Sequence, residues 1–116
     1  MDPYVKLQLG NQNQKTKTHK DAGKNPSWYD VFEMQRTNED TLHLHVYDSD
    51  VGKDDLVGSG TYSINQLLTL PGYHYSGNIP LLYKSKSAGE IFVDITFHPN
   101  QAPMAQPGYP QAYPQP

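Results

Sequence analysis

The sequence contains no cysteine in its 116 residues, so it offers no disulfide framework, thiolate nucleophile or zinc–thiolate site. This absence suits a reducing compartment, and we expect a cytoplasmic protein. The sequence also lacks an apolar run near the roughly 20 residues that a membrane span needs. Its start, Met1-Asp2-Pro3-Tyr4, has neither the basic segment nor the apolar core of a signal peptide. We therefore expect contact with membranes only from outside.

An excess of positive charge is also missing, because nine basic residues face twelve acidic ones and the net charge is −3. This balance argues against a strongly basic nucleic-acid binder, and we expect no nucleic-acid partner. There is no Gly-x-Ser-x-Gly motif and no glycine-rich phosphate loop with its lysine. We expect a protein that is not an enzyme.

Apolar residues alternate with polar ones wherever they cluster, as in Leu42-His43-Leu44-His45-Val46, and this period of two is typical of half-buried strands. Turn-forming residues separate the clusters, which favours an all-β antiparallel sandwich. A single short helix is predicted over residues 63–70, with Ser63 as its N-cap. The seven candidate strands lie near residues 3–9, 14–19, 28–34, 41–47, 58–63, 78–83 and 90–98.

The composition changes after residue 98, because six of the ten prolines fall in the last eighteen residues. We expect a folded domain over 1–98 and a disordered Pro/Gln/Tyr-rich tail over 99–116. The tyrosines of the tail, Tyr109 and Tyr113, suit docking into an aromatic groove of a protein partner. An inert solubilising tail is the alternative.

Four carboxylates occur within eight residues at the end of a predicted strand: Asp48, Asp50, Asp54 and Asp55. Like charges at this density repel one another, and a hard, oxygen-seeking cation such as calcium relieves the repulsion. The pattern is not an EF-hand, since it lacks the glycine and the closing glutamate of that loop. A solvated acidic turn is the competing interpretation.

Three segments in this order resemble the C2 domain, the lipid-binding module of protein kinase C and the synaptotagmins. They are Asp2 to Leu7, Lys15 to Thr18 with Asn25-Pro26-Ser27-Trp28, and the acidic segment Val46 to Gly58. The resemblance runs from Asp2 to about Pro99. It implies an antiparallel sandwich of eight strands whose loops at one end hold calcium ions, which then bridge to anionic phospholipid.

The resemblance also implies particular ligands. Family calcium-ligand positions match Asp2, Asp48, Asp50 and Asp55, with Asp54 as a substitute beside the last of them. Positions that contact a phosphoinositide headgroup in protein kinase C-type relatives match Tyr4, Lys6, Lys15 and Lys17. An ordinary solvated strand face is the other interpretation of these lysines. From the loop itself, Val51 is the candidate inserting side chain, with Lys53 at headgroup depth.

One departure from the family is that its first strand, with a further calcium-binding aspartate, is missing here, which leaves about seven strands and an open slot. Three explanations stay open: a truncated gene model, an edge completed by another chain, or a degenerate domain.

The leading hypothesis is a peripheral adaptor that binds phosphatidylserine, or a phosphoinositide, when cytoplasmic calcium rises. The alternatives are a calcium-independent protein-interaction domain and a truncated C2 fragment without activity of its own. The His43/His45 pair shares one strand face, where two exposed histidines are favoured over a transition-metal site because no third ligand is near.

Overall fold

The computed structural model describes residues 2–19 and 27–99, whose backbone forms one antiparallel sheet with very little helix. The sheet order is β2-β1-β3-β4-β5-β6, and every neighbouring pair is antiparallel. The all-β antiparallel class predicted from the sequence is therefore confirmed. The strands are β1 Pro3–Leu9, β2 Gln12–Lys15, β3 Thr41–Asp48, β4 Asp55–Ser63, β5 His74–Tyr83 and β6 Lys86–Thr96.

Strand β3 lies at the centre of the first layer, between β1 and β4, and its alternation divides the layer into two faces. Leu42, Leu44 and Val46 are buried, whereas the residues between them are only half-buried. On β1, Val5 is opposite Val46 and is also buried. Burying each such side chain contributes about 1.5–3 kcal/mol, so this row anchors the layer.

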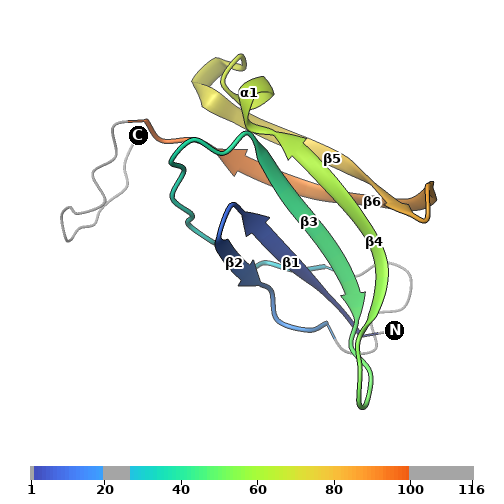
Figure 1. The fold of residues 1–116 in the computed structure, drawn as a ribbon. Helices are drawn as coiled ribbons and strands as arrows, with labels where there is room; N and C mark the ends of the chain where they lie inside the picture. The colour runs from blue at the N-terminus through green and yellow to red at the C-terminus, as the bar shows by residue number, and fades with distance from the viewer. Residues whose placement is uncertain (1, 20–26, 100–116) are drawn as a thin grey trace.

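The β5–β6 hairpin crosses the inner face of β3 and β4 and closes the core from the other side (Figure 1). Two glycines of β4 allow this close approach: a Cβ on Gly60 would lie 2.7 Å from the carbonyl oxygen of Pro80, and one on Gly58 would lie 3.0 Å from the Cβ of Ala88. Only one ladder pair, Ser59 with Leu82, joins β4 to β5. The single sheet therefore folds over into the two layers of a sandwich, with Ile79 and Leu81 of β5 in the core.

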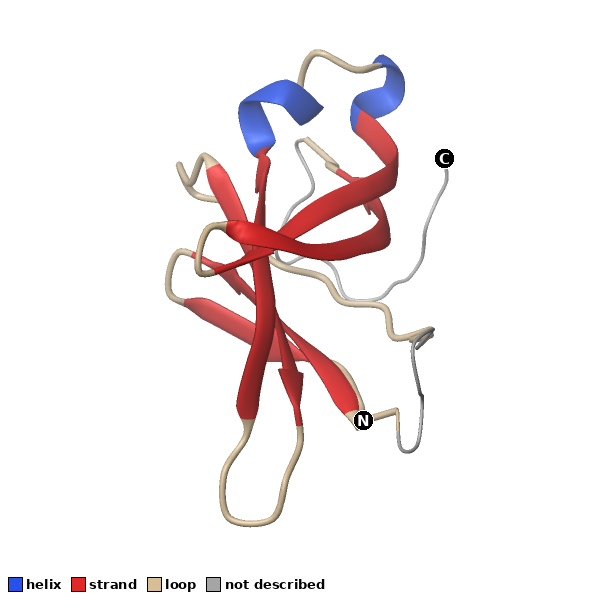
Figure 2. Cartoon of the chain, turned by 90° about the vertical axis from the view of Figure 1, so that its right-hand side faces the viewer, coloured by secondary structure: helices blue, strands red, loops and turns tan. Residues whose placement is uncertain are grey.

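Short helical segments close the end of the molecule where β4 finishes (Figure 2). The helix α1, Ile64–Leu67, begins where Ser63 accepts a hydrogen bond from the backbone N–H of Gln66, so the predicted N-cap is confirmed. Leu67 is 1% exposed and covers the core. The 3₁₀ turn η1, Pro71–Tyr73, then leads into β5.

One predicted strand is wrong. Residues 28–34 alternate in burial as a strand does, but they belong to none of the six strands of the described chain. Their contacts run through side chains, as when the indole Nε1–H of Trp28 donates to the carbonyl of Pro3. The predicted strand over 14–19 is also displaced, because regular pairing ends at Lys15. The expected tail lies outside the described residues, apart from Pro99.

Candidate metal centre and its outer strand face

The amino-terminal residues and the acidic segment meet at the end of β3. The backbone N–H of Asp2 donates to Asp48 Oδ1 at 2.9 Å, and the N–H of Ser49 donates to the carbonyl of Asp2 at 2.9 Å. Asp48 is also directly opposite Asp55, because they form the last pair of the β3–β4 ladder. Three of the predicted ligand residues, Asp2, Asp48 and Asp55, are thus neighbours although they are far apart in sequence.

The other two predicted ligands lie in the loop between β3 and β4, residues 49–54. Asp50 accepts a hydrogen bond from the N–H of Val51 at 2.7 Å, and its own N–H donates to Asp54 Oδ1 at 3.3 Å. The second oxygen of Asp54 accepts the hydroxyl proton of Tyr4 at 2.5 Å. This hydrogen bond, followed by burial and the negative charge of Asp54, raises the pKa of Tyr4 to about 12. Asp54 is therefore turned toward the outer face of β1.

The five aspartates are chemically suited to calcium, because their carboxylates supply only oxygen, the ligand atom that calcium prefers. They do not converge as they stand: within residues 2–19 and 27–99, no group of three or more histidine, cysteine, aspartate or glutamate side chains is arranged to hold a metal ion. Asp50 and Asp54 are engaged with loop amides, and Asp54 also with Tyr4. Binding calcium would require these side chains to turn.

The same loop carries an apolar tip, and Figure 2 shows it projecting at the end opposite the helical segments. Val51 is 101% exposed relative to a reference residue, and Gly52 and Lys53 beside it are also exposed. An apolar side chain held in water beside a lysine is the arrangement that an anionic lipid surface can accept.

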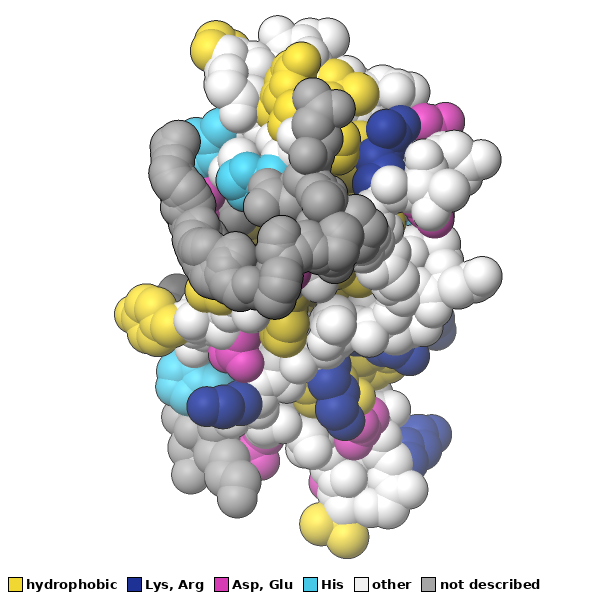
Figure 3. Space-filling model, turned by 90° about the vertical axis from the view of Figure 1, so that its left-hand side faces the viewer, with side chains coloured by type: hydrophobic (Ala, Val, Ile, Leu, Met, Phe, Trp, Pro, Cys, Tyr) yellow, Lys and Arg dark blue, Asp and Glu magenta, His cyan; other side chains and the backbone are white. Residues whose placement is uncertain are grey.

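The outer face of β1 and β2 brings together most of the predicted lipid contacts. Lys6 is paired with Lys15 across the ladder. The Lys15 ammonium lies 5.4 Å from the centroid of the Tyr4 ring, within reach of a cation–π contact. Lys17 follows two positions beyond Lys15, with its N–H bonded to Asp30 Oδ2 at 3.1 Å. On the face drawn in Figure 3, basic side chains gather in the lower half of the molecule, the half that carries the acidic loop.

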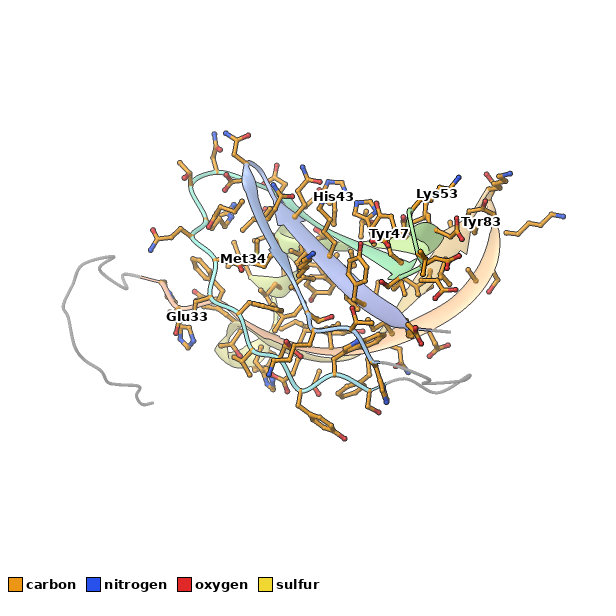
Figure 4. The ribbon with its side chains drawn as sticks, turned by 90° about the horizontal axis from the view of Figure 1, so that it is seen from below. Glu33, Met34, His43, Tyr47, Lys53 and Tyr83 are labelled. Atoms are coloured by element: carbon orange, nitrogen blue, oxygen red, sulfur yellow. The ribbon has the colours of Figure 1, made fainter. Side chains whose placement is uncertain are left out.

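Sequence reasoning missed Tyr47 as a member of this face. Its ring stacks on that of Tyr4, with centroids 5.5 Å apart and planes at 21°. Figure 4 shows His43 and Tyr47 along β3, with Lys53 beyond Tyr47. The signal was present in the alternation of β3, since positions 43, 45 and 47 must share a face.

The comparisons with known proteins agree with this architecture. The sequence matches the family model described as C2 domain over residues 1–81. It is 33% identical over 109 residues to Elicitor-responsive protein 1 of Oryza sativa subsp. japonica, covering 84% of this chain and 69% of that protein. It is 39% identical over 101 residues to Multiple C2 domain and transmembrane region protein 8 of Arabidopsis thaliana, covering 84% of this chain and 10% of that protein.

A solved C2 domain-containing protein shares the fold with a TM-score of 0.76 at 29% identity, covering 91% of this chain and 78% of that one. The chain belongs to the C2 domain family. Members of this family are generally binding modules for membranes, lipids or proteins rather than enzymes. None of the helices in the described part of the chain is long and apolar enough to cross a bilayer.

Proposed function

We propose that this domain binds anionic phospholipid membranes in a calcium-dependent manner, through the end of the molecule formed by Asp2 and the loop 49–54. The observation that carries the proposal is the position of Asp48, which accepts the N–H of Asp2 and is opposite Asp55. Carboxylates on directly opposed strand positions, as Asp48 and Asp55 are, repel one another, so a doubly charged cation is favoured there. Asp48, Asp50 and Asp55 would hold calcium, together with Asp2, and calcium would supply the bridge to lipid phosphate.

Asp54 has a different part in this proposal. Its carboxylate is shared between Tyr4 and the amide of Asp50, so it joins the ion only if the Tyr4 hydroxyl releases it. Calcium binding would then change the outer face at Tyr4 as well as the loop. Calcium binding in the loop and phosphoinositide binding on the outer face of β1 and β2 would be linked through the Tyr4–Asp54 hydrogen bond.

Membrane contact would follow from charge and exposure. Neutralising the loop removes the repulsion between its aspartates and anionic lipid, while Val51 enters the interface. Lys53 of the loop, with Lys6, Lys15 and Lys17 on the neighbouring face, would each add about 1 kcal/mol near an anionic surface. We therefore expect reversible binding that weakens as salt is added. Phosphatidylserine is the expected lipid, at the cytoplasmic surface of a membrane.

The test is cosedimentation of the full chain with phosphatidylcholine vesicles, with and without phosphatidylserine, in calcium or in chelator. We expect binding only with phosphatidylserine and calcium together. Asp50→Asn should lose at least about tenfold in affinity, because it removes one ligand charge. Asp40→Asn is the matched control, since Asp40 lies at the opposite end of β3 and pairs with Arg36 at 3.6 Å.

A calcium-independent protein-interaction domain is the second candidate, and one observation favours it. The carboxylates of Asp50 and Asp54 accept hydrogen bonds from loop amides and, for Asp54, from Tyr4, and they would have to give these up for an ion. Isothermal titration of the folded chain with calcium separates the two functions. Vesicle binding that is as strong in chelator as in calcium, or a calcium titration that releases no heat, would contradict a calcium-dependent function. The proline-rich tail remains the proposed contact for a protein partner.

A further inference from the structure

The outer face of the sandwich has a hollow of about 300 Å³ between β3, β4 and β5, away from the acidic loop. Its walls differ in chemistry. One side carries the imidazoles of β3, the floor carries hydroxyls of β4, and the other side is apolar. The residues that line it include His43, His45, Ser59, Thr61, Pro80 and Leu82.

The register of β3 and β4 places the imidazoles and hydroxyls in matched pairs. His43 is opposite Thr61, and His45 is opposite Ser59. The two imidazole rings are parallel within 3°, with centroids 6.4 Å apart. Two ring edges and two hydroxyls therefore border the same small volume.

One of these rings is held in place by a hydrogen bond. His45 Nδ1 lies 2.8 Å from Ser59 Oγ. When His45 is protonated, both ring nitrogens carry hydrogen, so Nδ1 donates to Ser59 and Nε2–H remains for another acceptor. The Ser59 hydroxyl, which then accepts, has its own hydrogen left to donate. Protonation thus turns the pair into two donors.

The charged groups beside the two imidazoles are basic, whereas one carboxylate, Glu90 of β6, is opposite Pro80 on the apolar side of the hollow. Lys6 on β1 is paired with His45, and Lys15 is paired with Lys6 one strand further out. The other facing groups are uncharged, namely Gln8 opposite His43, the hydroxyls of β4, and the ring of Tyr47 at 6.4 Å from that of His45. Burial, then the positive charges of His43 and Lys6, lowers the pKa of His45. An anion would remove this repulsion.

We propose that this hollow binds a phosphate group, held by His43, His45, Ser59 and Thr61 with Lys6 at its rim, and that acidification strengthens the binding. Phosphate suits the site because its oxygens accept from several donors at once, and the donors here come from two adjacent strands. A transition-metal ion is disfavoured, since it would lie beside Lys6 with no carboxylate in the lining. The site needs no calcium, so its failure would leave the proposed function of the acidic loop intact.

The direction of the pH effect follows from which form of histidine can bind. Only the imidazolium offers two donors and a positive charge, and its population rises as pH falls through about 6.5 and below. Between about pH 7.5 and pH 5.5 the competent fraction grows about tenfold or more, and the apparent dissociation constant falls by the same factor. Sulfate is the informative companion ligand, because its charge does not change over this range.

The experiment is an NMR titration of the full chain in chelator with inorganic phosphate and, separately, sulfate at both pH values. We expect shifts at His43, His45, Ser59 and Thr61, with about tenfold tighter binding of sulfate at the lower pH. Phosphate should gain less, because it loses negative charge over the same range. His45→Gln should weaken anion binding at the lower pH and reduce the pH dependence to what His43 alone supplies. His74→Gln is the matched control, because His74 is a histidine of β5 that pairs with Asp94 at 2.9 Å and lies outside the lining.

Ser59→Ala tests the geometry without removing a charge, and it should weaken anion binding while the ring remains. Vesicles containing phosphatidic acid, compared with soluble phosphate, identify the source of the phosphate group. Capture on these vesicles in chelator at low pH, lost in His45→Gln, assigns a lipid headgroup, and shifts with soluble phosphate alone assign a free phosphate. Sulfate binding that is equal at both pH values, or anion binding that is unchanged in a folded His45→Gln variant, would contradict the proposed phosphate site.

Discussion

At the scale of single residues, Tyr62 stands out because its side chain is buried but its hydroxyl has no partner among the described residues. Its ring stacks on Tyr75, with centroids 4.8 Å apart. Burial accordingly raises the pKa of the Tyr62 hydroxyl. The ring packs in the core and stabilises it, whereas burying the hydroxyl without a hydrogen-bond partner costs free energy of folding.

Tyr62→Phe should therefore leave the free energy of unfolding unchanged or raise it by about 1 kcal/mol, as measured by urea denaturation. The matched control is Tyr75→Phe, whose hydroxyl donates to the carbonyl of Asn78 at 2.9 Å. That variant should lose about 0.5–1.5 kcal/mol. A loss of more than about 1 kcal/mol in Tyr62→Phe would show that its hydroxyl has a partner after all.

Tyr4 is the second residue with a definite prediction, since its hydroxyl occupies one oxygen of Asp54. If Asp54 must turn to reach calcium, Tyr4→Phe removes the competitor while keeping the ring that stacks on Tyr47. We expect calcium affinity to rise a few-fold in isothermal titration, with Tyr47→Phe as the control. An unchanged affinity would mean that Asp54 takes no part in holding the ion.

At the scale of elements, the fold depends on the two glycines that let β5 cross β4. Gly60→Ala would place a methyl group 2.7 Å from the carbonyl oxygen of Pro80, and backbone cannot move aside as a flexible side chain can. We expect a loss of about 1–3 kcal/mol in unfolding free energy. Gly52→Ala controls for the change of residue type, because nothing lies within 4 Å of its added Cβ, although its φ of 89° adds some strain.

The same elements show what a sequence can and cannot predict. Alternation located β1 and β3 closely, because each has apolar residues at every second position that face the core. It found β6 but placed its start four residues too late, because alternation with half-buried apolar residues begins only near Ile91. It failed for residues 28–34 because alternation reports which side chains are buried and carries no information about a backbone partner. Trp28 and Met34 do pack against the core, so the side chains behave as predicted although the segment is no strand.

The candidate site divides in a similar way. The acidic cluster was visible because its members lie within eight residues of the sequence, and the resemblance to the C2 family joined Asp2 to it. In the structure the backbone N–H of Asp2 donates to Asp48 Oδ1, so the two residues are neighbours, and their role as calcium ligands stays a prediction. The Tyr4–Asp54 hydrogen bond joins residues fifty positions apart, and no local sequence pattern predicts such a contact.

At the scale of the whole molecule, the distribution of charge matters more than the net charge of −3. The acidic loop and the basic face of β1 and β2 lie at the same end, where Asp54 bonds Tyr4 and Lys15 covers the Tyr4 ring. The described helical segments lie at the other end. One end of the molecule thus carries both the acidic loop and the basic face of β1 and β2.

The last prediction concerns stability as a function of pH. The lowered pKa of His45 means that the folded chain binds this proton more weakly than the unfolded chain does. Stability contributed by neutral His45 is present above the unfolded value of about 6.5 and is lost as pH falls below it. The unfolding free energy should decline by at most about 1.4 kcal/mol per pH unit for this one proton. Urea denaturation at a series of pH values above and below about 6.5, carried out on the wild-type chain and on His45→Gln, isolates the contribution of His45 to the unfolding free energy. Added phosphate should restore stability at low pH if the hollow binds it, and a decline of equal slope in His45→Gln would assign the effect to other groups.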